Sequence, residues 1–176
     1  MKKVILIVTI SAISFAGFSQ TSKGTWLVGG TAGFSSAKTG DTKLSSIDFS
    51  PNVGYFVMDK LALGLNVEIG SQTSNLGGGA ADVKSSSTSI GPNVRYYFTS
   101  LGKNAKLFGS GTYFFGSSKV GSASVSSSGW GLSAGPAFFL NKNVALEVTL
   151  GYSSASVSSS GWGLSAGPAF FLNKNV

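Results

Sequence analysis

The sequence contains no cysteine and no histidine among its 176 residues. Without cysteine there can be no disulfide and no thiol chemistry. Without histidine the serines lack the base of a Ser-His-Asp triad, and a Cys-His pair is excluded as well. The nitrogen and sulfur ligands that zinc prefers are also missing. These absences argue against an enzyme and predict no catalytic residue, no metal site and no cofactor.

Charge is scarce, because only 11% of the residues are Asp, Glu, Lys or Arg, and the formal net charge is +7. The basic residues are scattered singly, without a basic cluster or a helix to carry one, so we expect no nucleic-acid partner. One glycine motif, residues 129–134 (GWGLSA), matches the dinucleotide fingerprint G-x-G-x-x-A. That motif functions only between a strand and a helix, and here it lies inside an alternating strand with Pro136 after it.

The N-terminus has the pattern of a secretory signal peptide. Lys2 and Lys3 precede an apolar run from Val4 to about Phe18, which is shorter than the roughly 20 residues of a spanning helix. We expect residues 1–19 to be removed, with cleavage after Ala16 or after Ser19. Removing Lys2 and Lys3 leaves 11 basic and 6 acidic residues, a net charge of +5 on a single domain of residues 20–176.

Beyond the leader, the hydrophobic period is two almost everywhere. The clearest stretch is Ile47–Gly70 (IDFSPNVGYFVMDKLALGLNVEIG), in which apolar residues alternate with small or polar ones on both sides of Met58–Lys60. Such alternation predicts two strands joined as an antiparallel hairpin.

The same pattern predicts eight strands in all. Their expected positions are residues 25–35, 47–57, 61–70, 88–98, 105–115, 130–140, 144–152 and 162–172. Polar segments at 36–46, 71–86, 116–127 and 153–161 are expected to form four long loops at one end, and short turns alternate with them at the other end. The sequence therefore predicts an all-β, antiparallel up-and-down barrel of eight strands.

Two repeats accompany this pattern. A loose one recurs through the even strands as SPNVGYF (50–56), GPNVRYYF (91–98) and GPAFF (135–139). A second one is identical letter for letter, because residues 154–176 duplicate residues 122–144. Either a tandem duplication or a misassembled sequence end would produce it.

The face opposite the apolar one carries Gly, Ser, Asn and Thr, which suit the narrow inside of an eight-stranded barrel better than a water-exposed exterior. Aromatic residues of the apolar face gather at the two ends of the strands, as the girdles of a transmembrane barrel do. The belt expected at the turn end contains Trp26, Tyr55, Tyr96, Phe98, Phe138 and Phe170, and the belt at the long-loop end contains Phe34, Tyr113, Phe115, Trp130, Tyr152 and Trp162. A closed barrel also pairs every ladder donor and acceptor, as lipid requires.

This layout resembles the small outer-membrane β-barrels of Gram-negative bacteria, the OmpA/OmpX-like eight-stranded group. The segments that carry the resemblance are KGTW (23–26), SPNVGYFVMDKLALGLNVEIG (50–70) and GPNVRYYF (91–98), within a similarity over about residues 20–172. The resemblance implies an outer-membrane location and a barrel without a particular reaction.

Charged residues on the inward face predict a polar network in the lumen, because a charge there needs a partner. We expect a Glu68–Arg95 ion pair if the loop after residue 70 centres near Ala81, and we expect Asn52 to lie opposite Asn66. The whole predicted network is Asp48, Ser50, Asn52, Asn66, Glu68, Asn93, Arg95, Lys106 and Glu147.

The sequence favours a monomeric barrel with a structural or surface-interaction role, its lumen filled by polar side chains and its Ser/Gly/Lys loops exposed. Its expected partners are outer-membrane lipid and lipopolysaccharide. A narrow pore for ions or small solutes is the alternative, followed by a soluble secreted barrel that holds a small apolar ligand.

Overall fold

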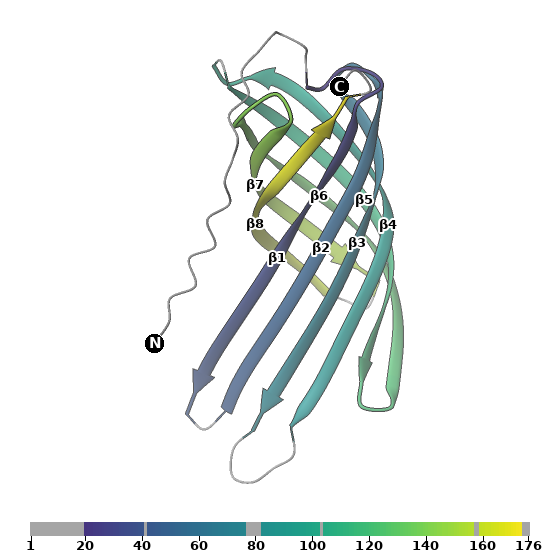
Figure 1. The fold of residues 1–176 in the computed structure, drawn as a ribbon. Helices are drawn as coiled ribbons and strands as arrows, with labels where there is room; N and C mark the ends of the chain where they lie inside the picture. The colour runs from purple at the N-terminus through teal and green to yellow at the C-terminus, as the bar shows by residue number, and fades with distance from the viewer. Residues whose placement is uncertain (1–19, 41, 77–81, 103, 157–158, 174–176) are drawn as a thin grey trace.

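A computed structural model describes residues 20–40, 42–76, 82–102, 104–156 and 159–173, so the predicted signal peptide lies outside the described residues. Eight strands each pair antiparallel with the next, and β1 pairs with β8 to close a barrel (Figure 1). The strands are β1 Trp26–Thr39, β2 Thr42–Met58, β3 Leu61–Asn75, β4 Val83–Ser100, β5 Ala105–Val120, β6 Ala123–Phe139, β7 Val144–Ala155 and β8 Ser159–Leu172. The predicted all-β fold and its topology are confirmed. Across the described residues no helix has the length and apolarity needed to cross a membrane.

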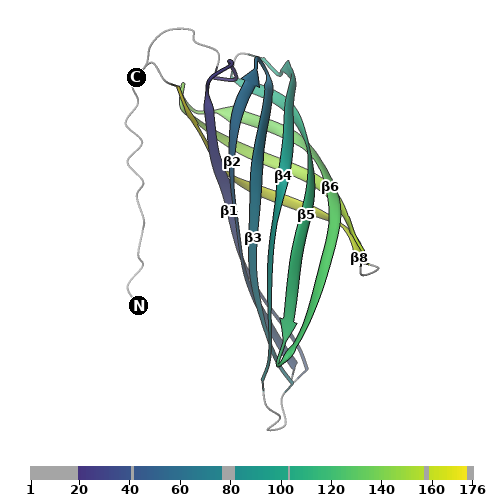
Figure 2. The ribbon, with the colours of Figure 1, turned by 90° about the vertical axis from the view of Figure 1, so that its right-hand side faces the viewer.

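The predicted bounds of all four long loops are wrong, because the strands continue into each of them. The β1–β2 ladder runs to the pair Thr39↔Thr42, and the β5–β6 ladder runs to Val120↔Ala123. Figures 1 and 2 show these hairpins extending past β7 and β8, at the end of the barrel opposite the C-terminus. The prediction failed because hydrophobic alternation stops where lipid stops, whereas ladder hydrogen bonding does not need apolar side chains.

The apolar side chains of the barrel wall point outward. Leu63, Val94 and Leu146, from three different strands, are 45%, 48% and 44% exposed. Their neighbours along the chain, Ala62, Arg95 and Glu147, are buried. The predicted orientation, with apolar residues outside and small or polar residues inside, is therefore correct for these strands.

The junction between β1 and β8 is short, because only four pairs from Trp26↔Leu172 to Gly29↔Ala169 join the two strands. A Cβ placed on Gly167 would lie only 2.2 Å from the Gly30 carbonyl oxygen, so the two backbones approach closely just past this ladder. The identical segments of the repeat thus occupy different surroundings, since β6 pairs along its whole length with β5. One sequence forms both a central strand and a strand at the closing junction.

Candidate functional site

The interior of the barrel is closed at the turn end by a cluster of apolar side chains, which we call the aromatic plug. Its aromatic members are buried to 8% exposure or less, and each contacts at least one other ring at centroid distances of 5.2 to 6.4 Å. They come from β2, β4, β5, β6 and β8 and are Phe56, Tyr97, Phe108, Phe139 and Phe171. Leu27 and four alanines from β3, β6, β7 and β8 fill the space between them: Ala62, Ala137, Ala145 and Ala169.

A buried ion pair lies against this plug. Arg95 Nη1 of β4 donates to both carboxylate oxygens of Glu147 on β7 at 2.8 Å, and the two side chains are only 9% and 11% exposed. The Tyr97 hydroxyl donates to Glu147 Oε1 at 3.2 Å, and the Arg95 guanidinium carbon lies 4.5 Å from the centroid of the Phe108 ring. Attraction, hydrogen bonds and the ring face together offset the desolvation of the two charges.

The predicted Glu68–Arg95 pair is wrong. The β3–β4 ladder pairs Glu68 with Ser89 and Arg95 with Ala62, so its hairpin centres between residues 78 and 79 rather than near Ala81. Glu68 instead accepts a 3.2 Å hydrogen bond from Ser89 Oγ. An error of about three residues in the centre shifts the register by six, an even number, so both side chains keep the inward face and only the partners change.

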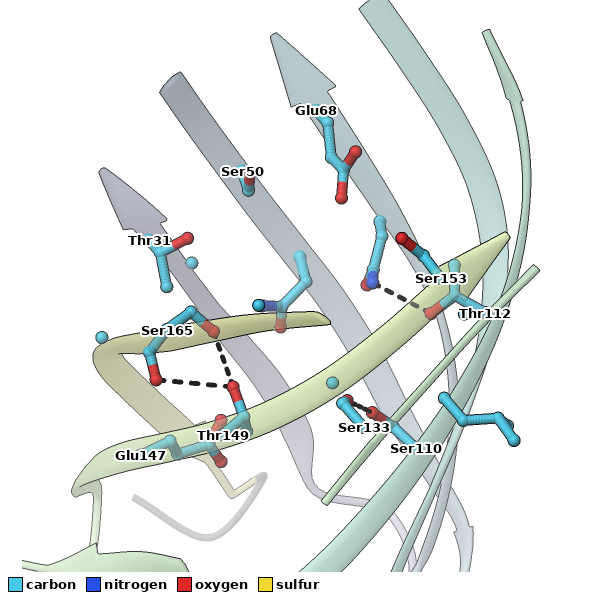
Figure 3. A pocket seen from close by; sticks show the side chains of 18 of the residues that line it. Thr31, Ser50, Glu68, Ser110, Thr112, Ser133, Glu147, Thr149, Ser153 and Ser165 are labelled. Atoms are coloured by element: carbon cyan, nitrogen blue, oxygen red, sulfur yellow. Dashed lines mark hydrogen bonds between the residues drawn. The ribbon is translucent and has the colours of Figure 1, made fainter. Parts of the chain in front are cut away.

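Above the ion pair the interior widens into a cavity of about 340 Å³. Of the predicted network, six residues line this cavity: Ser50, Asn52, Asn66, Glu68, Arg95 and Glu147. Asn52 lies opposite Asn66 in the β2–β3 ladder, as predicted. Many lining hydroxyls are paired with one another or with amides, including Ser110 with Ser133 at 2.7 Å and Thr149 with Ser165 at 2.6 Å (Figure 3).

The other three residues of the predicted network lie elsewhere. Asn93 donates to Thr112 Oγ1 at 2.8 Å on the inner wall, and Asp48 lines a separate recess nearer the long hairpins. Lys106 lies at the turn end, where its ammonium group donates to Thr21 Oγ1 at 2.9 Å and lies 5.5 Å from the Phe139 ring. The nine residues therefore share the inside of the barrel but form no single network.

The segment before β1, residues 20–25, lies across the turn end of the barrel. The Lys60 backbone N–H donates to the Thr21 carbonyl oxygen at 2.7 Å. The Gly24 backbone N–H donates to the Phe56 carbonyl oxygen at 2.8 Å. Lys23 N also donates to Asp59 Oδ1 at 2.8 Å in the β2–β3 turn. This segment is therefore fixed to the turn end of the barrel, next to the aromatic plug.

Sequence reasoning missed the aromatic plug, although a signal for it was present. Each plug aromatic follows an outward apolar residue directly, as in Tyr55-Phe56, Tyr96-Tyr97, Leu107-Phe108, Phe138-Phe139 and Phe170-Phe171. In a strand the two members of such a doublet point to opposite faces. Each doublet thus places one apolar side chain on the outside, a ring in every case except Leu107, and one ring in the lumen.

The outward aromatic members of these doublets, Tyr55, Tyr96, Phe138 and Phe170, belong to the belt at the turn end, and a second belt lies at the other end of the strands. At the turn end the Trp26 and Tyr55 rings are in contact at 5.1 Å, and Tyr96 contacts Phe98 at 5.3 Å. At the other end contacts join Tyr113 with Phe115, and Tyr152 with both Trp130 and Trp162, at 5.0 to 5.8 Å. The remaining belt residues, Phe34, Phe138 and Phe170, are exposed on the outer face.

This interior offers hydrogen bonding and charge but little catalytic chemistry. In the described part of the chain no group of three or more acidic, histidine or cysteine side chains could hold a metal ion. Most of the described hydroxyls in the cavity lie beside amides or one another, whereas the Ser89 hydroxyl donates to the Glu68 carboxylate at 3.2 Å.

Comparison with solved structures finds similar folds at low sequence identity. Neisserial surface protein A matches with a TM-score of 0.59 and 18% identity, over 84% of this chain and 97% of that one. The N-terminal β-barrel domain of Pseudomonas aeruginosa OprF matches with a TM-score of 0.58 and 11% identity, over 85% and 98%. Ail of Yersinia pestis, in a complex with the heparin analogue sucrose octasulfate, matches with a TM-score of 0.56 and 16% identity, over 85% and 99%. At such identities these matches show the fold alone.

The sequence itself provides the family. No match was found among curated proteins. The family model described as "Outer membrane protein beta-barrel domain" matches residues 5–170, nearly the whole chain. The chain therefore belongs to the outer membrane protein beta-barrel domain family.

Proposed function

We propose that the protein is a monomeric outer-membrane barrel that does not conduct, and that it acts through contacts of its outer surface and long hairpins. The observation that carries this proposal is the aromatic plug, because Phe56, Tyr97, Phe108 and Phe171 are at most 1% exposed. Buried side chains that pack against one another across the lumen block the passage of water and ions, and barrels of eight strands are usually filled in this way.

A narrow pore is the second candidate, and the cavity favours it. Its 340 Å³ lies inside the barrel and is lined by hydroxyls, amides and carboxylates. The cavity ends, however, on Arg95 and Glu147, whose side chains are paired across the lumen directly against the plug. A conducting state would have to separate this pair and displace several aromatic rings together.

Planar-bilayer recording distinguishes the two candidates. We expect the purified protein to give no steady single-channel conductance at voltages that leave the barrel folded. The variant Phe56→Ala/Phe108→Ala removes two plug rings and should conduct. It serves as the positive control for insertion into the bilayer and for the recording. Steady channels from the unaltered protein would refute the proposal and favour the pore.

Export through a cleaved signal peptide is part of the same proposal. The charged and apolar pattern of residues 1–19 supports it. The intact mass of protein extracted from outer membranes should correspond to a chain that begins at Gly17 or at Gln20. A mass that includes the leader would contradict cleavage.

A further inference from the structure

Four lysines lie near the ends of the long hairpins, on β1, β2, β4 and β5, and form two pairs. Lys38 and Lys43 are direct cross-strand partners. Lys119 is the partner of Ser86, so Lys84, two residues from Ser86, is its diagonal neighbour. All four side chains are exposed.

These lysines point away from the lumen. Ser36 and Ser45, two residues from Lys38 and Lys43, have their hydroxyls 3.5 Å apart, while Ser35 and Ser46 pair at 2.8 Å on the opposite face. Ser46 belongs to the recess inside the barrel, so the other face is the outside. The same alternation applies on β4 and β5, where a Cβ on inward Gly70 would meet Ser87, and a Cβ on Gly116 would meet Ser89. Lys84 and Lys119 have the opposite parity and face outward.

Acidic residues of the strands have the reverse distribution. The three within the described strands, Asp48, Glu68 and Glu147, all lie on the inner face. The strands therefore place these lysines on the outer face without a carboxylate on that face. Outside the strands, Asp82 lies two residues before Lys84 and accepts a 2.9 Å hydrogen bond from Asn75 Nδ2. Like charges directly opposite each other destabilise a sheet, so an anion beside the two ammonium groups would stabilise the Lys38–Lys43 pair.

The distance of the lysines from the aromatic belt indicates which kind of anion they can reach. Lys38 lies four residues beyond Phe34, and Lys119 lies four residues beyond Phe115, and both aromatics belong to the outer belt. Four residues span roughly 13 Å along a strand, or about 10 Å along the barrel axis at a tilt of about 40°. Aromatic belts mark the border of the hydrocarbon layer, so the ammonium groups reach the level of lipid headgroup phosphates.

We infer that the two lysine pairs bind phosphate groups of the outer-leaflet lipid, and specifically those of lipopolysaccharide. The inference rests on the proposed function, because it requires the long hairpins to be on the outer side of the outer membrane. A headgroup with two separate phosphates suits two pairs of ammonium groups better than a phospholipid with one. Side chains of a cross-strand pair start about 5 Å apart, so both members can reach one phosphate.

The test measures lipid binding by the full-length mature protein in detergent micelles. The probes are diphosphoryl lipid A, phosphatidylglycerol and phosphatidylcholine, and the readout is the bound fraction in native mass spectrometry at graded ammonium acetate concentrations. We expect lipid A to bind most tightly and to dissociate as salt rises. At roughly 1 kcal/mol per lysine, Lys38→Gln/Lys43→Gln should weaken lipid A binding by about thirtyfold, and Lys84→Gln/Lys119→Gln by a similar factor.

Lys142→Gln is the matched control, since this exposed lysine lies in the β6–β7 turn at the opposite end of the barrel. It should leave lipid A binding within about twofold of the unaltered protein. An equal loss in all variants would reduce the effect to net charge and overturn the inference, as would unchanged binding in both double variants. Phosphatidylglycerol binding as tight as that of lipid A would overturn the assignment to lipopolysaccharide.

Folding and function are checked separately. The gel shift between unheated and boiled samples reports whether each variant keeps its barrel, and the substituted lysines lie outside the buried interior. Conductance of the same preparations tests the proposed function, so a failure of lipid binding and the appearance of a pore are distinct results.

Discussion

The Arg95–Glu147 pair provides the sharpest prediction about stability. Replacing Glu147 with Gln keeps the shape of the side chain but leaves the Arg95 guanidinium without its counter-charge at 9% exposure. Removing one partner of a buried ion pair destabilises a protein by about 3–5 kcal/mol, since an uncompensated charge remains. We expect a loss in this range, which for about 150 residues lowers the melting temperature by roughly 10–15 °C.

The assay is unfolding in urea from lipid vesicles, followed by the gel shift between folded and unfolded barrel. The double variant Arg95→Met/Glu147→Leu removes both charges and should recover most of the loss, because apolar side chains can replace a buried pair. The difference between the double variant and the sum of the single ones then gives the coupling free energy of the pair.

Glu68→Gln is the internal control, because Glu68 is exposed in the cavity and has one 3.2 Å hydrogen bond, from Ser89. It should change the free energy of unfolding by no more than about 0.5 kcal/mol. A Glu147→Gln variant as stable as the unaltered protein would show that the buried Arg95 does not depend on Glu147 for its counter-charge. So would a Glu68→Gln variant that loses as much, since Arg95 would then depend on Glu68.

Two further predictions use matched positions. Gly129→Ala should destabilise the barrel by about 1–3 kcal/mol, because its Cβ would lie 2.3 Å from the Ser154 carbonyl oxygen. Gly161→Ala has the same local sequence but no atom within 4 Å of its Cβ, and should be close to neutral in the same urea assay; equal effects would contradict the different surroundings of β6 and β8. Phe171→Ala should cost about 3–5 kcal/mol, since this ring is fully buried against three other plug aromatics. Trp162→Ala, at a ring that is 75% exposed on the outer face, should lose far less free energy of unfolding, and an equal loss would contradict the plug.

Alternation predicted the strands and their faces because lipid on one side and a narrow lumen on the other select side chains at every second position. Leu63 and Val94 therefore point outward as expected. Residues 36–46 and 116–127 were mistaken for loops because they lie beyond the belts, where neither face is held to an apolar pattern. The ladder continues there through backbone hydrogen bonds and serine pairs such as Ser35–Ser46.

The partners of side chains inside the barrel were harder to predict than whether each side chain points inward or outward. Pairing of adjacent strands depends on the centre of the connecting loop, and the three glycines at 77–79 give no signal for that centre. Arg95 and Glu147 lie on β4 and β7, which do not pair in the sheet, so no ladder register brings them together. Only the closure of the barrel does so, and a linear sequence carries no local trace of that approach.

One face of each strand meets lipid, and the other face meets the interior of the barrel. Because the chain has no cysteine, a single spin label can be attached at Phe49→Cys or at Ser50→Cys, adjacent residues of β2. Phe49 is 52% exposed on the outer face, and Ser50 lines the cavity. In lipid bilayers we expect oxygen, which concentrates in lipid, to relax the label at position 49 more strongly, and a water-soluble nickel chelate to relax the label at position 50 more strongly. The reverse pattern, or equal access of both reagents at the two positions, would contradict this orientation of the strands.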